Sequence, residues 1–214
     1  MFTKISDAST ISGNFPHAQR HSEPSAGSAV CLGGKSKVEG KSVHETPNIE
    51  LTPEFYDAHA SLFNLLQETI AWNESMRSRK TASFGKPYEY SQMTYEATEI
   101  PACLRPLQSQ LIEHLAIPFN NCLLNLYESG ENTMGFHSDE TSGLVPGTGV
   151  SIVSLGCQRT ITFRSIDRRT RVDYSLPPGS MLYMNAGVQD DWQHAIRRQP
   201  LAKSRISLTW RAIE

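Results

Sequence analysis

The chain has 214 residues, of which 38% are hydrophobic and 20% charged, so it can form one globular domain with a substantial core. Its formal net charge of −2 and pI of about 6.4 give no overall signal for nucleic acid, although they leave room for a local basic face. No apolar run reaches the ~18–20 residues that cross a bilayer, and four scattered cysteines without a C-x-x-C pair favour a reduced intracellular protein.

Residues 1–50 differ in composition from the rest of the chain. They are rich in Ser, Gly, Pro and Lys, have only isolated apolar residues, and lack the apolar core of a secretory signal. Such a segment buries too little apolar surface to offset the entropy lost on ordering, so we predict a largely disordered tail. The alternative is that part of it packs as an N-terminal arm. The ordered domain would then occupy residues 51–214.

Two amphipathic helices are predicted at the start of this domain. A Thr-Pro pair at 52–53 can begin a helix, and apolar residues then recur every three or four positions over 53–71. Leucines with the same period predict a second helix over 102–116. The polar and aromatic segment 77–95 lies between them and contains Gly and Pro residues that would break a helix.

After Pro118 the sequence changes to short strands separated by Gly, Pro, Asn and Asp. We predict six strands, at 121–128, 149–155, 160–164, 170–176, 180–184 and 205–213. No helical pattern separates them, which indicates an antiparallel barrel or a double-sheet sandwich. The predicted fold class is therefore mostly β with N-terminal helices (α+β).

A metal-binding pattern lies among these strands. His137 and Asp139 are two residues apart, so in a strand both would face one ion, and His194 follows 55 residues after Asp139. Two histidines and one carboxylate form the facial triad that holds Fe(II) and leaves the opposite positions open to small molecules. Zinc is the competing metal, because three protein ligands and a water also form a catalytic zinc site.

Two arginines in the last strand favour the iron hypothesis. Arg205 and Arg211 share a face with Ser207 and Thr209, whereas apolar residues alternate on the other face. Inward-facing guanidinium groups need anions, and a dicarboxylate that also chelates iron would supply them. The alternative is that both arginines face solvent or pair with acidic side chains.

A series of short motifs resembles the AlkB family of Fe(II)/2-oxoglutarate dioxygenases. In the family's order and spacing they are Asn125-Leu-Tyr127-Glu-Ser-Gly130, His137-Ser-Asp139-Glu140, Ser154-Leu-Gly156, Arg159-Thr-Ile-Thr-Phe163, Gly179-Ser-Met-Leu-Tyr-Met184, Asp191-Trp-Gln-His194 and Arg205-Ile-Ser-Leu-Thr-Trp-Arg211. An upstream piece, Phe84-Gly-Lys-Pro-Tyr-Glu-Tyr-Ser91, resembles the substrate lid of the nucleic-acid demethylase branch. The resemblance covers about residues 77–213 and implies a double-stranded β-helix (jelly-roll) core.

The resemblance also implies the cofactors and their ligands. Fe(II) would be bound by the two histidines and the aspartate named above, with O₂ at an open position. Arg205 and Tyr127 would hold the distal carboxylate of 2-oxoglutarate, and Arg211 and Asn125 would contribute near its other end. Ser207 and Thr209 would complete the lining on the same face of the last strand. The implied reaction is oxidative demethylation of N-alkylated bases in DNA or RNA, releasing formaldehyde, succinate and CO₂.

The substrate side is expected to combine the lid with nearby polar groups. Tyr90, with Tyr88 and Ser91 beside it, would stack on a flipped base, and Glu140 and Thr141 would lie near the base edge. Basic residues around the motifs could form a phosphate-binding rim or simply a solvated face: Arg77, Arg79, Lys80, Arg168, Arg169, Arg171, Arg197 and Arg198.

The sequence departs from the resembled demethylases at two positions. Thr141 stands where an acidic residue commonly meets a cationic base, and Ser207 stands where the family usually has Asn. The first departure and the acidic pI favour a second hypothesis, a 2-oxoglutarate-dependent hydroxylase of a small metabolite or a protein. A third hypothesis is a non-catalytic binding module. In each case we expect a monomer without a membrane span, cytoplasmic or, in a eukaryote, nuclear.

Overall fold

The computed structural model describes residues 45–90 and 93–214, and the side chains of residues 88–95 lie outside this description. The larger sheet has six strands, in the spatial order β1 (Ile49–Thr52), β10 (Met181–Met184), β7 (Val150–Gly156), β12 (Arg205–Arg211), β5 (Asn121–Tyr127) and β2 (Lys80–Gly85). The smaller sheet has the order β6 (Met134–His137), β11 (Trp192–Ile196), β8 (Arg159–Ser165) and β9 (Arg171–Leu176). A separate hairpin pairs β3 (Tyr88–Tyr90) with β4 (Met93–Tyr95).

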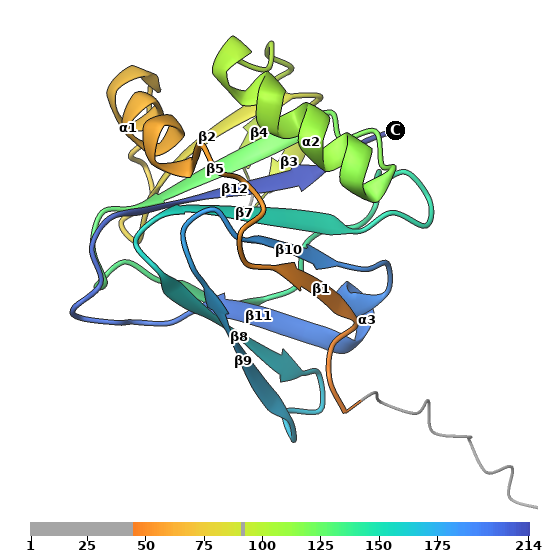
Figure 1. Ribbon diagram of the computed structural model, residues 1–214. Helices are drawn as coiled ribbons and strands as arrows, with labels where there is room; N and C mark the ends of the chain where they lie inside the picture. The colour runs from red at the N-terminus through yellow and green to blue at the C-terminus, as the bar shows by residue number, and fades with distance from the viewer. Residues whose placement is uncertain (1–44, 91–92) are drawn as a thin grey trace, which may run out of the picture. The chain divides into compact units, whose positions relative to one another are not determined.

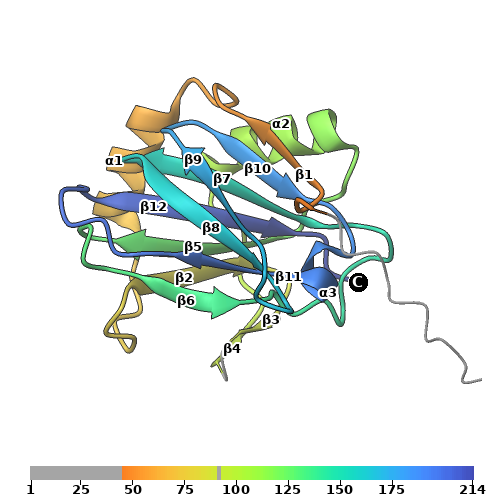
Figure 2. The same cartoon turned by 90° about the horizontal axis from the view of Figure 1, so that it is seen from below.

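The two sheets and the helices form layers. Helices α1 (His59–Thr69) and α2 (Arg105–Leu115) cover one face of the larger sheet, and the smaller sheet lies on its other side (Figure 1). Figure 2 shows the domain from below, with β8 and β9 crossing in front of the larger sheet. All sheet pairings are antiparallel. The predicted fold class, mostly β with N-terminal helices and a jelly-roll core, is confirmed.

Strand β12 lies between two apolar clusters that make up most of the core. Its residues Ile206, Leu208 and Trp210 are buried against the helices, in a cluster that also contains Leu66 and Leu111. A second apolar cluster fills the space between the two sheets; among its members are Ile152, Ile161, Phe163, Leu182 and Trp192. The other face of β12 points into this space. The alternation predicted for the last strand therefore separates an apolar layer from a polar pocket.

The start of the first predicted helix was wrong. Thr52 ends strand β1, and the helix begins only at His59. The backbone N–H groups of Phe55 and Tyr56 both donate to the carbonyl of Gly179, at 3.0 Å each. These tertiary hydrogen bonds hold the segment between β1 and α1 in a turn conformation instead of a helix. The second predicted helix matches a short 3-10 turn, Ala102–Leu104, followed by α2.

The six predicted strands match β5, β7, β8, β9, β10 and β12 within a residue or two. Strands β1, β2, β6, β11 and the β3–β4 hairpin were not predicted. β1 pairs with β10, so the folded domain begins before residue 51. Residues 1–44 of the predicted tail lie outside the described residues. A four-residue helix, α3 (Val188–Asp191), precedes β11. None of the helices in the described ranges is long and apolar enough to cross a membrane.

Candidate metal and cosubstrate site

Three potential metal ligands meet at one end of the space between the sheets. His137 is the last residue of β6 and lies directly opposite His194 in the β6–β11 pairing. Asp139 follows just beyond the end of β6, so the two side chains reach the same point without the shared strand that their two-residue spacing would use. The ligand atoms of the three residues lie within 4.8 Å of one another. The three residues that the sequence pattern singled out, His137, Asp139 and His194, thus form a cluster in the folded chain.

The Asp139 carboxylate has one oxygen bound and one available. Its Oδ1 accepts a 2.8 Å hydrogen bond from Nη2 of Arg211. Its Oδ2 is buried, has no hydrogen-bond partner within the described part of the chain, and lies 3.9 Å from Nε2 of His194. Burial alone would raise the pKa of Asp139, but the Arg211 guanidinium, together with the two histidine rings beside it, holds that pKa below the usual value. The group is therefore a carboxylate at neutral pH.

The two histidine rings are arranged to bind a cation. Burial lowers the pKa of His194 to about 4, so its ring is uncharged at neutral pH. Nδ1 of His137 lies 2.9 Å from the Gly135 carbonyl oxygen, which can only accept, so Nδ1 carries the hydrogen and donates this hydrogen bond. The lone pair of His137 is therefore on Nε2. The ring centroids of His137 and His194 are 4.3 Å apart. Two imidazole rings beside an unsatisfied carboxylate oxygen fit a divalent metal ion such as Fe(II).

Gln189 holds the backbone of the carboxylate ligand. Its side-chain Oε1 accepts a 2.8 Å hydrogen bond from the backbone N–H of Asp139, and its Nε2 lies 3.3 Å from Sδ of Met184. The Ser138 hydroxyl donates to the carbonyl of Trp192 at 3.1 Å. These contacts tie the segment after β6 to α3 and to the start of β11, and so fix where Asp139 lies.

The opposite end of the pocket contains a buried cation. Arg205 is 0% exposed, and its Nε donates to the Ser154 hydroxyl at 2.8 Å. Its Nη1 and Nη2 have no hydrogen-bond partner among the described residues. Burial lowers the pKa of Arg205 to about 10, so the guanidinium stays charged at neutral pH. Two adjacent donors on a desolvated cation match the two oxygens of a carboxylate.

Tyr127 lies beside this guanidinium. The Cζ atom of Arg205 is 5.4 Å from the centre of the Tyr127 ring, and Cζ of Arg159 is 5.6 Å from it. Burial raises the pKa of Tyr127, although the surrounding arginines oppose the shift, so its hydroxyl remains protonated and can donate. The hydroxyl lies 3.6 Å from Sδ of Met134.

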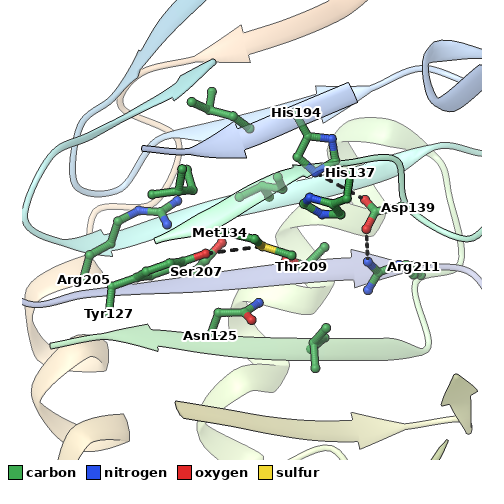
Figure 3. Close-up of a pocket in the computed structure, with 14 residues that line it drawn as sticks. Asn125, Tyr127, Met134, His137, Asp139, His194, Arg205, Ser207, Thr209 and Arg211 are labelled. Atoms are coloured by element: carbon green, nitrogen blue, oxygen red, sulfur yellow. Dashed lines mark hydrogen bonds and ion pairs between the residues drawn. The ribbon is translucent and has the colours of Figure 1, made fainter. Parts of the chain in front are cut away.

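One pocket joins the two ends (Figure 3). Its polar lining includes Asn125, Tyr127, His137, Asp139, His194, Arg205, Ser207, Thr209 and Arg211, and its apolar lining is Leu123, Met134, Ile152, Ile161 and Ile196. Every residue predicted for the metal and for 2-oxoglutarate therefore lines the same cavity. Arg205 and Arg211 are 0% and 1% exposed, so the alternative that they face solvent is wrong, whereas pairing with an acidic side chain holds for Arg211, which contacts Asp139.

The residues predicted for the substrate are not all brought to this pocket. Tyr88 and Tyr90 belong to β3, but their side chains, and Ser91 altogether, lie outside the described residues. Glu140 is exposed, and its Oε1 accepts hydrogen bonds from the backbone N–H groups of Thr141 and Ser142, at 2.9 and 2.8 Å. The carboxylate is thus turned toward its own loop. Thr141 lines a neighbouring cavity instead.

The predicted basic rim is only partly a free surface. Arg79 is buried, so its assignment to the rim was wrong. Lys80 pairs with Glu74 and Glu128, at 2.7 and 3.0 Å, and Arg198 pairs with Glu131. The remaining members are exposed: Arg77, Arg168, Arg169, Arg171 and Arg197.

Sequence reasoning missed several side chains that shape the pocket. Ser154 could have been found, because it lies on the same face of β7 as Ile152, two residues away. Met134, Gln189 and the deeply buried Arg159 carried no such signal. They contact the site through a bulged strand pair, a single helical turn and loop carbonyls, none of which has a sequence period.

Known proteins resemble this chain over most of the described domain. Residues 56–211 match the 2OG-Fe(II) oxygenase superfamily. Human alpha-ketoglutarate-dependent dioxygenase alkB homolog 3 is 30% identical over 160 residues, covering 69% of this chain and 55% of the human protein. Mouse DNA oxidative demethylase ALKBH2 is 32% identical over 148 residues, covering 63% of this chain and 62% of the mouse protein. The chain thus spans somewhat more than half the length of these relatives. The solved structure of OsALKBH1 superposes with a TM-score of 0.59 at 17% identity, covering 78% of this chain and 97% of that chain, and so shares the fold.

Proposed function

Because the chain belongs to the 2OG-Fe(II) oxygenase superfamily, we propose that it oxidatively demethylates N-alkylated bases in DNA or RNA. The observation that carries this proposal is the single pocket that holds both a His-Asp-His cluster and the unpaired guanidinium nitrogens of Arg205. Relatives named as a DNA oxidative demethylase and as alkB homologs support nucleic acid as the substrate class. The superfamily makes Fe(II), rather than zinc, the metal.

When bound, Fe(II), O₂ and 2-oxoglutarate would supply the oxidation, with one oxygen atom of O₂ ending in succinate, formed with CO₂, and the other in a hydroxyl group on the N-alkyl carbon, which for a methyl group leaves as formaldehyde. The residues of the chain prepare this reaction. Arg211 keeps Asp139 ionised, and burial keeps His194 neutral. Arg205 and Tyr127 offer donors to the far carboxylate of the cosubstrate. The apolar lining limits water around the reacting carbon.

An arginine cluster on the outer face of the smaller sheet also supports a nucleic-acid substrate. The Cζ atoms of Arg164 and Arg171 lie 4.0 and 5.8 Å from the centre of the Phe136 ring. Arg164 donates to Gln193 at 2.6 Å. Burial and the nearby charges of Arg168 and Arg171 lower the pKa of Arg164. Like charges held together beside an aromatic ring favour a phosphate-bearing partner.

The cluster lies close to the metal site in the fold. Phe136 and Gln193 immediately precede the ligands His137 and His194, so they face outward where the ligands face inward. A base held in the pocket leaves its flanking phosphates outside. We therefore assign this face to contacts with the phosphate backbone.

Formaldehyde release tests the proposed function. The protein is mixed anaerobically with Fe(II), 2-oxoglutarate and an N-methylated oligonucleotide, and oxygen is then added. Formaldehyde and succinate should appear in equal amounts, and His137→Ala, which removes a metal ligand, should form neither. Succinate that forms whether or not the oligonucleotide is present would refute the demethylase function.

A second candidate is a 2-oxoglutarate-dependent hydroxylase of a metabolite or protein. It is favoured by the small number of carboxylates at the pocket. Among the described lining residues Asp139 is the only acidic one. The carboxylate of Glu140 accepts hydrogen bonds from its own loop. A cationic methylated base would therefore find no free carboxylate there. A screen of methylated oligonucleotides and small acids, read by mass spectrometry, separates the two candidates.

Four further expectations belong to this proposal. We expect a monomer, which gel filtration tests, a cytoplasmic or nuclear location, and no attachment to membranes. Residues 51–214, together with Ile49 and Glu50 of β1, would act as the catalytic domain, and the residues before them would form a weakly ordered tail. A protein that elutes as a stable dimer would contradict the first expectation.

A further inference from the structure

A buried arginine outside the predicted cosubstrate set lies behind the pocket. Arg79 immediately precedes β2 and is 7% exposed. Its Nε donates a 2.8 Å hydrogen bond to Oδ1 of Asn125, which is itself 3% exposed and lines the pocket. Arg79 is therefore connected to the cosubstrate pocket through one side chain.

This hydrogen bond fixes the direction of the Asn125 amide. An arginine guanidinium only donates hydrogen bonds, so the amide group it contacts must be the oxygen. The amide nitrogen, which carries two N–H donors, is then left for the pocket. The opposite orientation would place N–H groups against a cation and an oxygen toward any anion in the pocket. Arg79 thus selects the orientation that suits an anionic ligand.

Asn125 lies where such a ligand would pass. Asn125 pairs with Ser207 on β12. Tyr127 pairs with Arg205, two residues farther along each strand from the metal cluster. Figure 3 shows Asn125 projecting from β5 into the pocket, between the Arg205 end and the Arg211 end. Its donors therefore face the part of a dicarboxylate that lies closer to the metal.

The Arg79 charge also acts on the pocket directly. Together with Arg205 and Arg159 it opposes the burial-driven rise in the pKa of Tyr127, whose ring centre lies 5.4 Å from Cζ of Arg205 and 5.6 Å from Cζ of Arg159. Arg159 is fully buried, and it donates to side-chain and backbone oxygens of Gln199, Ser129, Asn132 and Arg197. A pocket lined by Arg205 and Arg211, with Arg79 and Arg159 behind its wall, favours a ligand with more than one negative charge.

We propose that Arg79 is a positioning residue for 2-oxoglutarate: it orients the Asn125 amide so that its nitrogen donates to the cosubstrate. This inference rests on the cosubstrate assigned to the same site, but not on nucleic acid as the substrate. It also replaces the role predicted from the sequence, because a buried guanidinium cannot form part of an exposed phosphate rim.

A double-mutant cycle tests the proposal by binding alone. The protein is loaded with Mn(II) in place of Fe(II), and 2-oxoglutarate is titrated by calorimetry without oxygen. Arg79→Met and Asn125→Ala should each weaken binding on the order of tenfold, the size expected for a hydrogen bond to a charged group. The double variant should bind no more weakly than Asn125→Ala, because no amide remains to be oriented. Arg105→Met, which removes an exposed arginine paired with Glu99, serves as the control.

Two outcomes would overturn the proposal. One is unchanged binding in Arg79→Met, and the other is a double variant whose loss equals the product of the two single losses. A role of Arg79 in folding alone would lower the Tm of Arg79→Met without this dependence on Asn125.

A second variant keeps the test valid if Arg79→Met does not fold. Asn125→Asp preserves the side-chain shape and the contact with Arg79 but has no N–H donor. It should keep the Tm and lose most of the affinity for 2-oxoglutarate, and wild-type affinity would refute the assigned donor. Failure of the demethylase function would instead appear as intact 2-oxoglutarate binding with no formaldehyde from any methylated base.

Discussion

At the scale of single residues, the site depends on groups whose charge state is set by burial. His194 is 5% exposed, and its pKa falls from 6.5 to about 4. The folded protein therefore resists protonation of this ring, whereas the unfolded chain accepts the proton near pH 6.5. It follows that His194 makes the metal-free protein less stable as the pH falls from about 6.5 to about 4.

Chemical denaturation of the metal-free protein between pH 7 and pH 4 measures this effect. The free energy of unfolding should decrease across that interval, and it should decrease less in His194→Gln, which cannot titrate. The Asp139 contribution is separable, because its pKa is already low and its stabilisation is lost only at more acidic pH. Parallel curves for the two proteins would show that His194 is not the group responsible.

A second prediction at this scale concerns the shape of the Arg205 cation. Replacing it by lysine keeps one positive charge but loses the two adjacent donors that match a carboxylate. Arg205→Lys should raise the KM for 2-oxoglutarate about 10- to 100-fold, the equivalent of roughly 1.5–3 kcal/mol for a hydrogen bond to a charged group. Mn(II) affinity, measured separately, should stay within a factor of two or three of the wild type. A parallel loss of metal affinity would place Arg205 in a different role.

The sequence alone predicted the residues that lie at regular spacings. His137 and Asp139, the alternation along Arg205 to Arg211, and the pair Asn125 and Tyr127 all line one pocket. It could not predict Gln189 or Arg79, because their effects depend on contacts between segments 46 or more residues apart. The same limit explains why Arg79 was assigned to the surface: a lone arginine in a polar segment carries no sign of burial.

At the scale of elements, the predictable strands were those with strong apolar content. β5, β7 and β12 are buried along nearly their whole length, and their apolar residues are continuous or alternate. The missed strands are either short or polar, such as β6 with four residues and β2 with the sequence KTASFG. Their pairing with longer neighbours, rather than their own propensity, makes them strands.

The apolar face of β12 provides a prediction for this scale. Leu208 is 0% exposed and packs in the cluster beneath the helices, away from the pocket. Leu208→Ala should lower the free energy of unfolding by about 2–5 kcal/mol, the usual loss for a buried leucine. Urea denaturation measures this change, and calorimetry should show unchanged 2-oxoglutarate affinity in the folded fraction. A mild effect below about 1 kcal/mol would mean that the layer repacks around the cavity.

At the scale of the whole molecule, the jelly-roll could be predicted only in outline. Strand alternation and turn residues gave the fold class, but nothing local specified that β6 pairs with β11 while β7 pairs with β10 and β12. Such pairings join residues far apart in the sequence, so they depend on the assembled core. The resemblance of the ordered motifs to the AlkB family supplied what local patterns could not.

The proposed division into a tail and a domain is testable by limited proteolysis. β1 pairs with β10 from residue 49 onward, and the backbone of Asn48 accepts a hydrogen bond from Asn185. Trypsin should therefore cut first before residue 48 and leave a resistant fragment that contains the rest of the chain. The fragment should keep the Tm and the 2-oxoglutarate affinity of the full chain. A fall in Tm after cleavage would instead support a packed N-terminal arm.

The position of β12 has a consequence for how the protein moves. This strand is hydrogen-bonded on both sides, to β7 and to β5, and one of its faces belongs to the apolar core. Its amide protons should exchange with solvent only when the entire domain unfolds, while those of β6 should exchange far sooner. Arg205 and Arg211 would then stay fixed while a ligand binds. Any motion that opens the pocket to a substrate must come from the opposite wall, where the four residues of β6 form an edge of the smaller sheet.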